Sequence, residues 1–317
     1  MESPLTRRHL LKRILKAGIS FTVIPPIHIS QGILNFIPLK DRPMIERTIP
    51  ATGEKIPAIG MGTWQTFDVG NNKEKKANLE QVLKMFKERG GKFIDSSPMY
   101  GSSEAVVGEL SKKLGLQESL FLASKVWTSG KNEGTDQIEK TMRLMKAQKI
   151  DLMQVHNLVD YKTHLQTLRR MKDEGKVRYI GITHYTTSSY PDLMKVIKEH
   201  PLDFVQFNYS IQTRQAENSI LPFAAENGIA VVINRPFEGG SMFSKVKGLE
   251  VPSWAETFNC KSWGNFFLKY IISHPAVTCA IPATDNLKHL HDNMEALYGN
   301  LPDEQTRLKM AKFFDGL

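Results

Sequence analysis

The chain has 317 residues, of which 41% are hydrophobic and 24% are charged, and these values argue against a disordered or fibrous protein. No stretch approaches 18 uninterrupted apolar residues, which excludes a conventional membrane-spanning helix. Two cysteines, Cys260 and Cys279, are too few for a disulfide-stapled scaffold and show no zinc-type pairing, so no metal site is predicted. The formal charge of +9 is concentrated in residues 1–43, and no basic stripe with interleaved aromatic residues occurs, so we predict no nucleic-acid partner.

Residues 1–43 have the features of an export signal followed by a linker. The pair Arg7-Arg8 lies in a basic segment, residues 17–24 are apolar, and four prolines occur between positions 25 and 43. A basic segment before a short apolar one is typical of a signal, and the arginine pair is similar to that of bacterial twin-arginine signals. We therefore predict a periplasmic protein whose residues 1–30 make transient contact with export machinery or the membrane.

The fate of this segment leaves alternatives open. No A-x-A-like cleavage motif follows the apolar stretch, so the signal could be cut at an atypical site or stay attached as a membrane tether. The segment could instead be a basic amphipathic helix that lies on a membrane or on the protein itself. In that case the rest of the chain would work in the cytoplasm.

From residue 44 onward, short apolar runs alternate with amphipathic segments. Strands are predicted at 55–62, 92–96, 120–125, 150–156, 177–183, 203–209, 229–234 and 277–282. Helices are predicted at 73–89, 104–114, 132–148, 163–174, 188–199, 216–227, 262–273 and 286–297. Eight apolar strands alternating with eight helices indicate a single α/β domain, a (β/α)8 TIM barrel over residues 44–317.

A doubly wound open sheet is the alternative fold. It normally carries the sequence G-x-G-x-x-G after its first strand, where the glycines approach a dinucleotide. Gly60 and Gly62 fit two of these positions, but Gln65 occupies the third. The barrel is therefore the predicted fold.

Four titratable side chains lie at or just after the ends of three consecutive predicted strands. Asp95 and Tyr100 belong to the second strand and the turn after it, Lys125 ends the third strand and His156 ends the fourth. Active sites of such barrels lie at the carboxyl ends of the strands, so we expect these side chains to meet there. Each alone would also suit a structural role, such as an ion pair inside the barrel.

At these positions the sequence resembles the aldo-keto reductase family. The resemblance covers the chain from about residue 44 to its C-terminus, with motifs at 51–54, 59–64, 93–101, 124–125, 151–156, 175–181 and 281–283. It implies a short N-terminal β-hairpin around residues 51–54. It also implies a nicotinamide-dependent carbonyl reductase whose catalytic tetrad is Asp95, Tyr100, Lys125 and His156.

Each member of this tetrad has a task in carbonyl reduction. Hydride goes to carbon while a proton must reach the oxygen, and Tyr100 is the candidate general acid. A free phenol titrates near ~10, so Lys125, held as a cation by Asp95, is expected to lower the pKa of Tyr100. His156 is expected to hydrogen-bond the carbonyl oxygen and polarise it.

The resemblance further implies a cofactor site. Its residues are Thr63 and Trp64 near the nicotinamide, Thr183, His184 and Gln206 at the carboxamide, Asn234 and Arg235 at the stacking position, Gly239 and Ser241 near the phosphates, and Thr284, Lys288, His289, Asp292 and Asn293 at the adenosine end. Several positions depart from the family: His184 replaces an asparagine, Asn234 replaces an aromatic residue, and at the adenosine end Ala283 and His289 replace a lysine and an arginine.

The sequence thus predicts an NAD(P)H-dependent oxidoreductase that reduces a small aldehyde or ketone to an alcohol. NADPH is preferred to NADH, because Lys288 and His289 stand where the family binds the 2′-phosphate, although neither has the fork of arginine. A second class stays open. The same barrel could be a cofactor-binding regulatory or interaction subunit without steady turnover, and the altered position Asn234 favours this reading.

Overall fold

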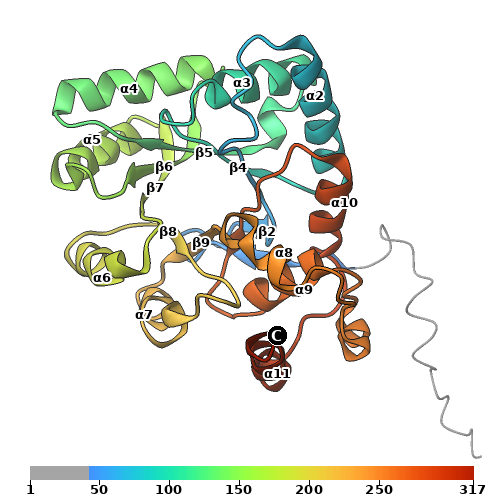
Figure 1. Cartoon of the computed structure of the whole chain (residues 1–317). Coiled ribbons are helices and arrows are strands. Elements are labelled where there is room, and N and C mark those ends of the chain that lie inside the picture. The colour runs from blue at the N-terminus through green and yellow to red at the C-terminus, as the bar shows by residue number, and fades with distance from the viewer. Residues whose placement is uncertain (1–42) are drawn as a thin grey trace, which may run out of the picture. The chain divides into compact units, whose positions relative to one another are not determined.

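A ring of eight parallel strands is the centre of this computed structural model, which describes residues 43–317 (Figure 1). The strands are neighbours in chain order: β3 (Met61–Gly62), β4 (Phe93–Asp95), β5 (Phe121–Val126), β6 (Ile150–His156), β7 (Val177–Thr183), β8 (Phe204–Asn208), β9 (Ala230–Asn234) and β10 (Cys279–Ala280). Parallel bridges from Ile59 to Ala280 and from Gly62 to Ala283 join the first strand to the last. The predicted (β/α)8 barrel is confirmed, whereas the predicted signal and linker lie outside the described residues, apart from Pro43.

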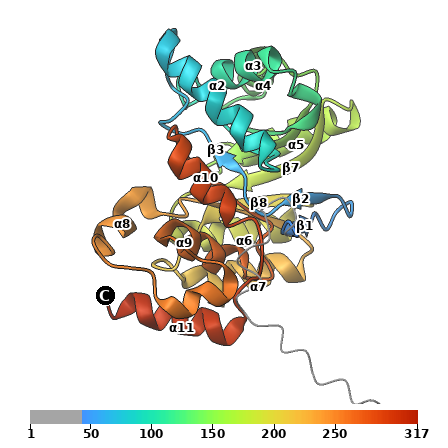
Figure 2. The ribbon, with the colours of Figure 1, turned by 90° about the vertical axis from the view of Figure 1, so that its right-hand side faces the viewer.

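Eight helices follow the eight strands and surround the ring (Figures 1 and 2). They are α2 (Lys73–Glu88), α3 (Ser103–Lys113), α4 (Lys131–Leu144), α5 (Tyr161–Asp173), α6 (Tyr190–Glu199), α7 (Ile220–Glu226), α9 (Trp263–Ile272) and α10 (Leu287–Glu295). All eight were predicted, with ends that differ by a few residues. Within residues 43–317, no helix is long and apolar enough to cross a membrane.

Helix α2 shows how the local sequence sets these elements. The Asn72 side chain accepts a hydrogen bond from the Lys75 backbone N–H at 2.9 Å and so caps the first turn. Gly90, with φ of 81°, takes the left-handed conformation just after the last turn. The buried side chains recur at the spacing of one helix face: Leu79, Val82, Leu83 and Phe86. This face packs on the barrel.

Two helices in the C-terminal third were not predicted. Helix α8 (Ser241–Lys245) lies in the segment 237–261, which was expected to be a loop, and it is too short to show a helical period. Helix α11 (Glu304–Asp315) lies in the expected tail, and Asp303 caps it by accepting from the Thr306 N–H at 2.8 Å. Only Met310 and Phe314 of α11 are buried, so its apolar stripe is weak in the sequence.

The predicted strand at 55–62 is two strands with different partners. Strand β2 (Lys55–Pro57) pairs antiparallel with β1 (Glu46–Thr48), which is the hairpin that the resemblance implied. Strand β3 belongs to the barrel. The partner changes after Pro57, because the Ala58 N–H donates to the Ile45 carbonyl, whereas the Gly60 N–H donates to that of Ala280.

The hairpin covers the end of the barrel at which the strands begin. Its Ile49 and Ile56 are buried in the same cluster as the interior residues Phe121 and Tyr179, whose ring centroids lie 5.9 Å apart. Figure 2 shows the hairpin on the opposite side of the barrel from α8. Side chains therefore fill the amino ends of the strands, which directs any site to their carboxyl ends.

Charged groups also tie the hairpin to this end, which we call the hairpin end. Arg178 of β7 donates to Asp151 of β6 at 2.6 Å and forms an ion pair with Glu54 of the hairpin. The Tyr179 hydroxyl donates to Glu54 at 2.7 Å and lies 2.7 Å from the Thr52 hydroxyl oxygen. One cation thus faces two carboxylates from separate elements.

Candidate active site

A buried ion pair lies at the carboxyl ends of β4 and β5. The Lys125 ammonium is fully buried and donates to Asp95 Oδ2 at 2.5 Å and to the Ser96 carbonyl oxygen at 2.7 Å. Burial by itself would lower the pKa of Lys125, but the attraction of Asp95 and then of Tyr100 raises this pKa overall. Lys125 is therefore a cation at neutral pH.

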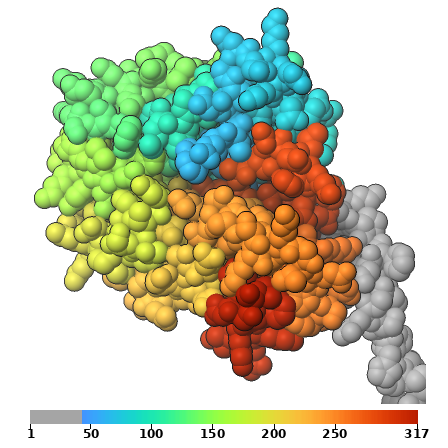
Figure 3. Space-filling model, in the orientation of Figure 1, coloured from blue at the N-terminus to red at the C-terminus, as the bar shows by residue number. Residues whose placement is uncertain are grey.

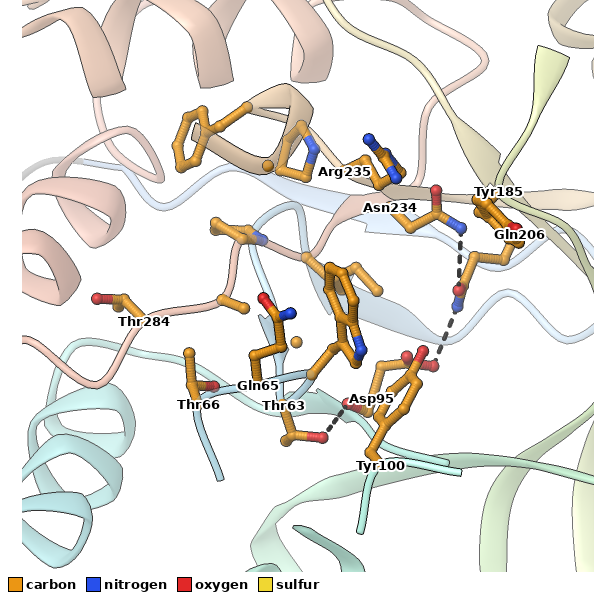
Figure 4. Close-up of a pocket in the computed structure, with 18 of the residues that line it drawn as sticks. Thr63, Gln65, Thr66, Asp95, Tyr100, Tyr185, Gln206, Asn234, Arg235 and Thr284 are labelled. Carbon is orange, nitrogen blue, oxygen red and sulfur yellow. Dashed lines mark hydrogen bonds between the residues drawn. The ribbon is translucent and has the colours of Figure 1, made fainter. Parts of the chain in front are cut away.

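Side-chain amides surround the other oxygen of Asp95. Gln154 of β6 and Gln206 of β8 both donate to Asp95 Oδ1, at 3.1 and 3.0 Å. The carbonyl oxygen of Gln206 accepts in turn from the Thr183 hydroxyl at 3.2 Å. It also accepts from the Asn234 amide at 3.3 Å, a bond that Figure 4 shows. A connected series of polar groups thus crosses the barrel from the ion pair to β9.

Tyr100 lies beside the ion pair, in the turn after β4 (Figure 4). Its ring centroid is 4.9 Å from the Lys125 ammonium nitrogen. Burial raises the pKa of Tyr100; the Lys125 charge opposes this rise, and the Asp95 charge adds to it. Lys125 lowers the pKa of Tyr100 as expected, but desolvation outweighs this effect, so the pKa is raised overall. The phenol keeps its proton at neutral pH, which is the state that a general acid needs.

His156, at the end of β6, meets the Tyr100 ring edge-on, with ring centroids 6.1 Å apart. Burial, followed by the charges of Lys125 and His184, lowers the pKa of His156 to about 3. Its imidazole is therefore neutral at physiological pH and carries one proton. Nδ1 lies 3.2 Å from the Ser97 hydroxyl oxygen, which leaves Nε2 for the cavity that His156 lines.

His184 is also a neutral ring with defined hydrogen bonds. Its Nδ1 accepts from the backbone N–H groups of Tyr185 at 3.0 Å and of Thr186 at 3.3 Å, and burial lowers its pKa. The proton is therefore on Nε2, so His184 offers a ring N–H donor to the cavity. The Tyr185 ring stacks on it at a centroid distance of 5.5 Å and supports this orientation.

One cavity of about 1030 Å³ lies at the carboxyl ends of the strands, and the residues named above that line it are Asp95, Tyr100, His156, Thr183, His184, Tyr185, Gln206 and Asn234. The residues of its wall lie between Gly62 and Asn293 and so come from segments that are far apart in the sequence. On the face shown in Figure 3, segments coloured blue, yellow and orange lie close together. In Figure 4, Thr284 lies at the opposite side of the view from Tyr100. Tyr100 and Thr284 therefore belong to two different ends of the cavity.

The structure gathers fifteen of the eighteen predicted site residues on this wall. They are Thr63, Trp64, Asp95, Tyr100, His156, Thr183, His184, Gln206, Asn234, Arg235, Gly239, Thr284, His289, Asp292 and Asn293. The three exceptions are Lys125, Ser241 and Lys288. Lys125 is buried behind Tyr100, the exposed Ser241 hydroxyl donates to the Glu238 carbonyl at 3.0 Å, and Lys288 is exposed on α10.

The end of the cavity distant from Tyr100 is formed by the start of α10 and the helix beside it. Asn286 caps α10 by accepting from the N–H groups of Lys288 and His289 at 2.9 and 3.2 Å. Asp292 accepts from the Ser262 hydroxyl at 2.6 Å, while burial raises its pKa against the effect of that bond. Gly264 makes room for this contact, since a Cβ there would lie 2.6 Å from Asp292 Oδ2.

Between the two ends, the segment after β9 turns sharply. Arg235, Glu238, Gly239 and Gly240 all have positive φ angles, between 49° and 93°. Such angles are easy for glycine and costly for the other two residues, so this turn is held by its surroundings. One such contact joins Phe237 to Phe243 of α8, with ring centroids 5.0 Å apart.

Sequence reasoning missed several residues of this site. Gln154 lies two positions before His156 on β6, so the alternation of a strand puts both side chains on one face, and this signal could have identified it. Met99, Tyr185 and Phe243 line the cavity although each is partly exposed. Met99 and Tyr185 are single residues outside helices and strands, and Phe243 lies in the five-residue helix α8, so none of them belongs to a recognisable period and the sequence offers no comparable signal for them.

Comparisons with known proteins agree with this geometry. The model of the aldo/keto reductase family matches residues 58–309. The chain is similar to the methylglyoxal reductase YeaE of Escherichia coli, with 25% identity over 80% of this chain and 90% of that protein. It is 27% identical to the aldo-keto reductase YhdN of Bacillus subtilis over 59% of this chain, and it spans only 60% of the length of that relative.

A solved structure has the same fold. It is an aldo/keto reductase from Klebsiella pneumoniae in complex with NADP and acetate, with a TM-score of 0.70 and 20% identity over 85% of this chain and 96% of that one. With the family match covering most of the chain, the protein belongs to the aldo/keto reductase family. It is accordingly an oxidoreductase that reduces carbonyl groups with a nicotinamide cofactor, and neither the structure nor the comparisons support the alternative of a non-catalytic subunit.

Proposed function

We propose that this reductase converts an aldehyde or ketone to the alcohol with NADPH, and that Tyr100 is its general acid. The observation that carries the proposal is a protonated phenol beside a buried Lys125–Asp95 pair, at the wall of a large cavity. A phenol in this position can give its proton to an oxygen in the cavity, because Lys125 stabilises the phenolate that remains.

The wall residues fit a nicotinamide dinucleotide. The Thr66 hydroxyl and the Asn234 carbonyl oxygen are buried without a hydrogen-bond partner among the described residues, as expected of groups that a ligand completes. Gly239 and Gly240 have open space where a Cβ would stand, so their backbone can approach a phosphate group closely. At the other end, Thr284, Asp292 and Asn293 offer polar groups to an adenosine.

The carboxamide end departs from the usual family arrangement. Gln206, which was expected to contact the carboxamide, donates to Asp95 and to Gln154, so its amide nitrogen is already engaged. The ring N–H of His184 is the donor that remains for a carboxamide oxygen, next to Asn234. We propose that His184, Thr183 and Asn234 hold this group together, with Arg235 and Trp64 at the sides of the ring.

For the cofactor type, we propose NADPH rather than NADH. His289, which lines the cavity, and Lys288 beside it are basic residues at the start of α10, where the helix N-terminus also favours a phosphate. This preference is measured by titrating the protein with NADPH or NADH and monitoring the quenching of its tryptophan fluorescence. His289→Gln should narrow the difference between the two dissociation constants, and equal affinity of the unaltered protein for both would contradict the proposal.

The chain's own residues then carry the proton chemistry. The bound cofactor supplies the hydride that reaches the carbonyl carbon. His156 donates its ring N–H to the carbonyl oxygen, which orients the substrate and stabilises the negative charge that grows there. Tyr100 donates its proton to the same oxygen, and Lys125 stabilises the phenolate. Asp95, held by Gln154 and Gln206, keeps Lys125 charged and in place.

The decisive experiment is cofactor oxidation by residues 44–317 against a panel of aldehydes, ketones and quinones. Tyr100→Phe removes only the acid, so kcat/KM should fall by a factor on the order of 10³ while cofactor affinity is kept. Tyr185→Phe, at a half-exposed tyrosine of the same cavity, is the matched control and should retain activity within a few fold. Turnover that Tyr100→Phe leaves unchanged, or binding of the cofactor with no turnover at all, would contradict the proposal.

We further propose that residues 1–43 are an export signal and linker that take the folded barrel, residues 44–317, to the periplasm through the twin-arginine route. The pair Arg7-Arg8 and the apolar stretch at 17–24 support it. Export after folding would let a cofactor bound in the cytoplasm travel inside the enzyme.

Cell fractionation tests the location. The full chain is expected in the periplasm, and both the deletion of residues 1–30 and the double substitution of Arg7 and Arg8 by lysine should keep it in the cytoplasm. Recovery with the membranes would point to an uncleaved tether. A full chain that stays in the cytoplasm would contradict export.

A further inference from the structure

A serine that the tetrad does not include touches its histidine. Ser97 is fully buried two residues after Asp95, and its hydroxyl oxygen lies 3.2 Å from His156 Nδ1. The same oxygen accepts the backbone N–H of Met99 at 3.3 Å. Among the described residues, these are the two hydrogen-bond partners of that hydroxyl.

This pair of contacts fixes the direction of the hydrogen bond. The Ser97 oxygen already accepts from Met99, and His156 Nδ1 is the acceptor within reach of its proton. If Nδ1 carried the ring proton, the serine hydroxyl would be a buried donor without an acceptor, which is an unfavourable arrangement. The serine therefore donates to Nδ1, and the one proton of the neutral ring is on Nε2.

We propose that Ser97 is a positioning residue that holds His156 in its Nε2–H tautomer, so that this N–H is directed at the carbonyl oxygen of the substrate. The inference rests on the proposed function, which supplies that oxygen. In the opposite tautomer, Nε2 presents a lone pair to an oxygen on which negative charge grows. Ser97 thus acts through His156 and does not touch the reacting atoms.

The tautomer can be measured without substrate. In ¹⁵N-histidine-labelled protein, long-range ¹H–¹⁵N spectra distinguish a protonated ring nitrogen from one with a lone pair, and His156→Gln assigns the signal among the nine histidines. We expect the pure Nε2–H form in the wild type, a mixture of tautomers in Ser97→Ala, and recovery in Ser97→Thr, which keeps a hydroxyl. Ser111→Ala is the matched control, since Ser111 is also buried but bonds within its own helix α3.

Kinetics test whether the serine works through the histidine. Ser97→Ala should lower kcat/KM by a factor on the order of five, which is the usual share of a neutral hydrogen bond, and mostly through kcat. In a His156→Gln background the same change should have no further effect, because residues that act as a unit are not additive. If Ser97→Ala is unstable, Ser97→Cys provides a weak donor of similar size for both measurements.

Two results would overturn the inference. One is an unchanged Nε2–H signal in Ser97→Ala, and the other is an equal loss of kcat/KM in the wild-type and His156→Gln backgrounds. If the wild type reduces no carbonyl compound, the proposed function fails, but the spectra still decide the tautomer. The two failures are therefore distinguishable.

Discussion

Each end of the barrel has a network of a basic residue and carboxylates, but one network connects structural elements and the other adjoins the proposed active site. At the hairpin end, Arg178 faces Asp151 and Glu54, and about a third of its side chain is exposed. At the carboxyl ends of the strands, which we call the catalytic end, the Lys125–Asp95 pair has side-chain exposures of 0% and 3%. The first network joins a hairpin to two strands, whereas the second adjoins the cavity, with Asp95 in its wall and Lys125 behind it.

The difference lies in the groups that surround each ion pair, and it explains why we propose a catalytic role for the second pair only. Arg178 is matched by more negative charge than it carries, and its neighbours are packed aromatic rings. Lys125 has one carboxylate partner and lies next to the Tyr100 phenol and the His156 imidazole. Burial raises the pKa of Tyr100 and lowers that of His156, so both side chains are neutral. A cation beside a neutral acid can stabilise the charge that appears when the acid gives up its proton. Three predictions test this contrast.

The largest effect is expected for Lys125→Met at the catalytic end. Asp95 would remain buried without its cation, which typically costs about 3–5 kcal/mol of folding free energy, and Tyr100 would lose the group that stabilises its phenolate. Urea unfolding should show the loss of stability, and kcat/KM should fall by a factor on the order of 10³. The double variant Asp95→Asn/Lys125→Met should regain much of the stability but none of the activity; recovery of both would mean that the pair is only structural.

An intermediate effect is expected from acid on the His156 ring. Its pKa of about 3 in the folded chain lies below the unfolded value near ~6.5, so between these values the unfolded chain binds a proton that the folded chain does not. Stability is therefore fully present above pH ~6.5 and is lost as the pH falls, by up to about 1.4 kcal/mol per pH unit. His274, which is partly buried and whose pKa is lowered to about 4, adds to this slope.

Chemical denaturation at a series of pH values measures the slope. His156→Gln should flatten it in part, because His274 remains. His291→Gln, at a half-exposed position of α10, is the control and should leave the slope as in the wild type. An identical slope in His156→Gln and the wild type would mean that burial of this ring is not what makes the fold sensitive to acid.

The smallest effect is expected at the hairpin end. Arg178→Met should lower the free energy of unfolding by about 1 kcal/mol, because the ion pairs are partly solvated, and should leave kcat within about twofold of the wild type. Arg214→Met, which removes an exposed ion pair with Asp315, is the control and should have less effect on stability. A marked loss of activity in Arg178→Met would show that the two ends are coupled and would contradict a purely structural role for the Arg178 network.

The hairpin shows where sequence patterns stop being informative. Residues 55–62 form one apolar run, and its period does not reveal that the first three residues pair with β1 while Met61 and Gly62 pair with β4. The choice depends on partners far away in the chain, namely Glu46–Thr48 on one side and Ala280 on the other. Helix α11 was missed for a related reason: only Met310 and Phe314 are buried, and part of its attachment is the ion pair of Arg307 with the distant Glu217, which leaves no apolar period in the sequence.

The sequence by itself determined the barrel, because apolar runs and helix faces repeat eight times, and it predicted the four proposed catalytic side chains, because they stand at or just after the ends of consecutive strands and match the motifs of the family. Only the tertiary structure decided how those side chains behave. The pKa of Tyr100 is raised and not lowered because burial outweighs the Lys125 charge. Gln206 is engaged by Asp95, and Ser97 meets His156, because distant strands place these groups at hydrogen-bond distance. Desolvation and hydrogen bonding depend on neighbours in space, and these become defined only when the ring of strands closes.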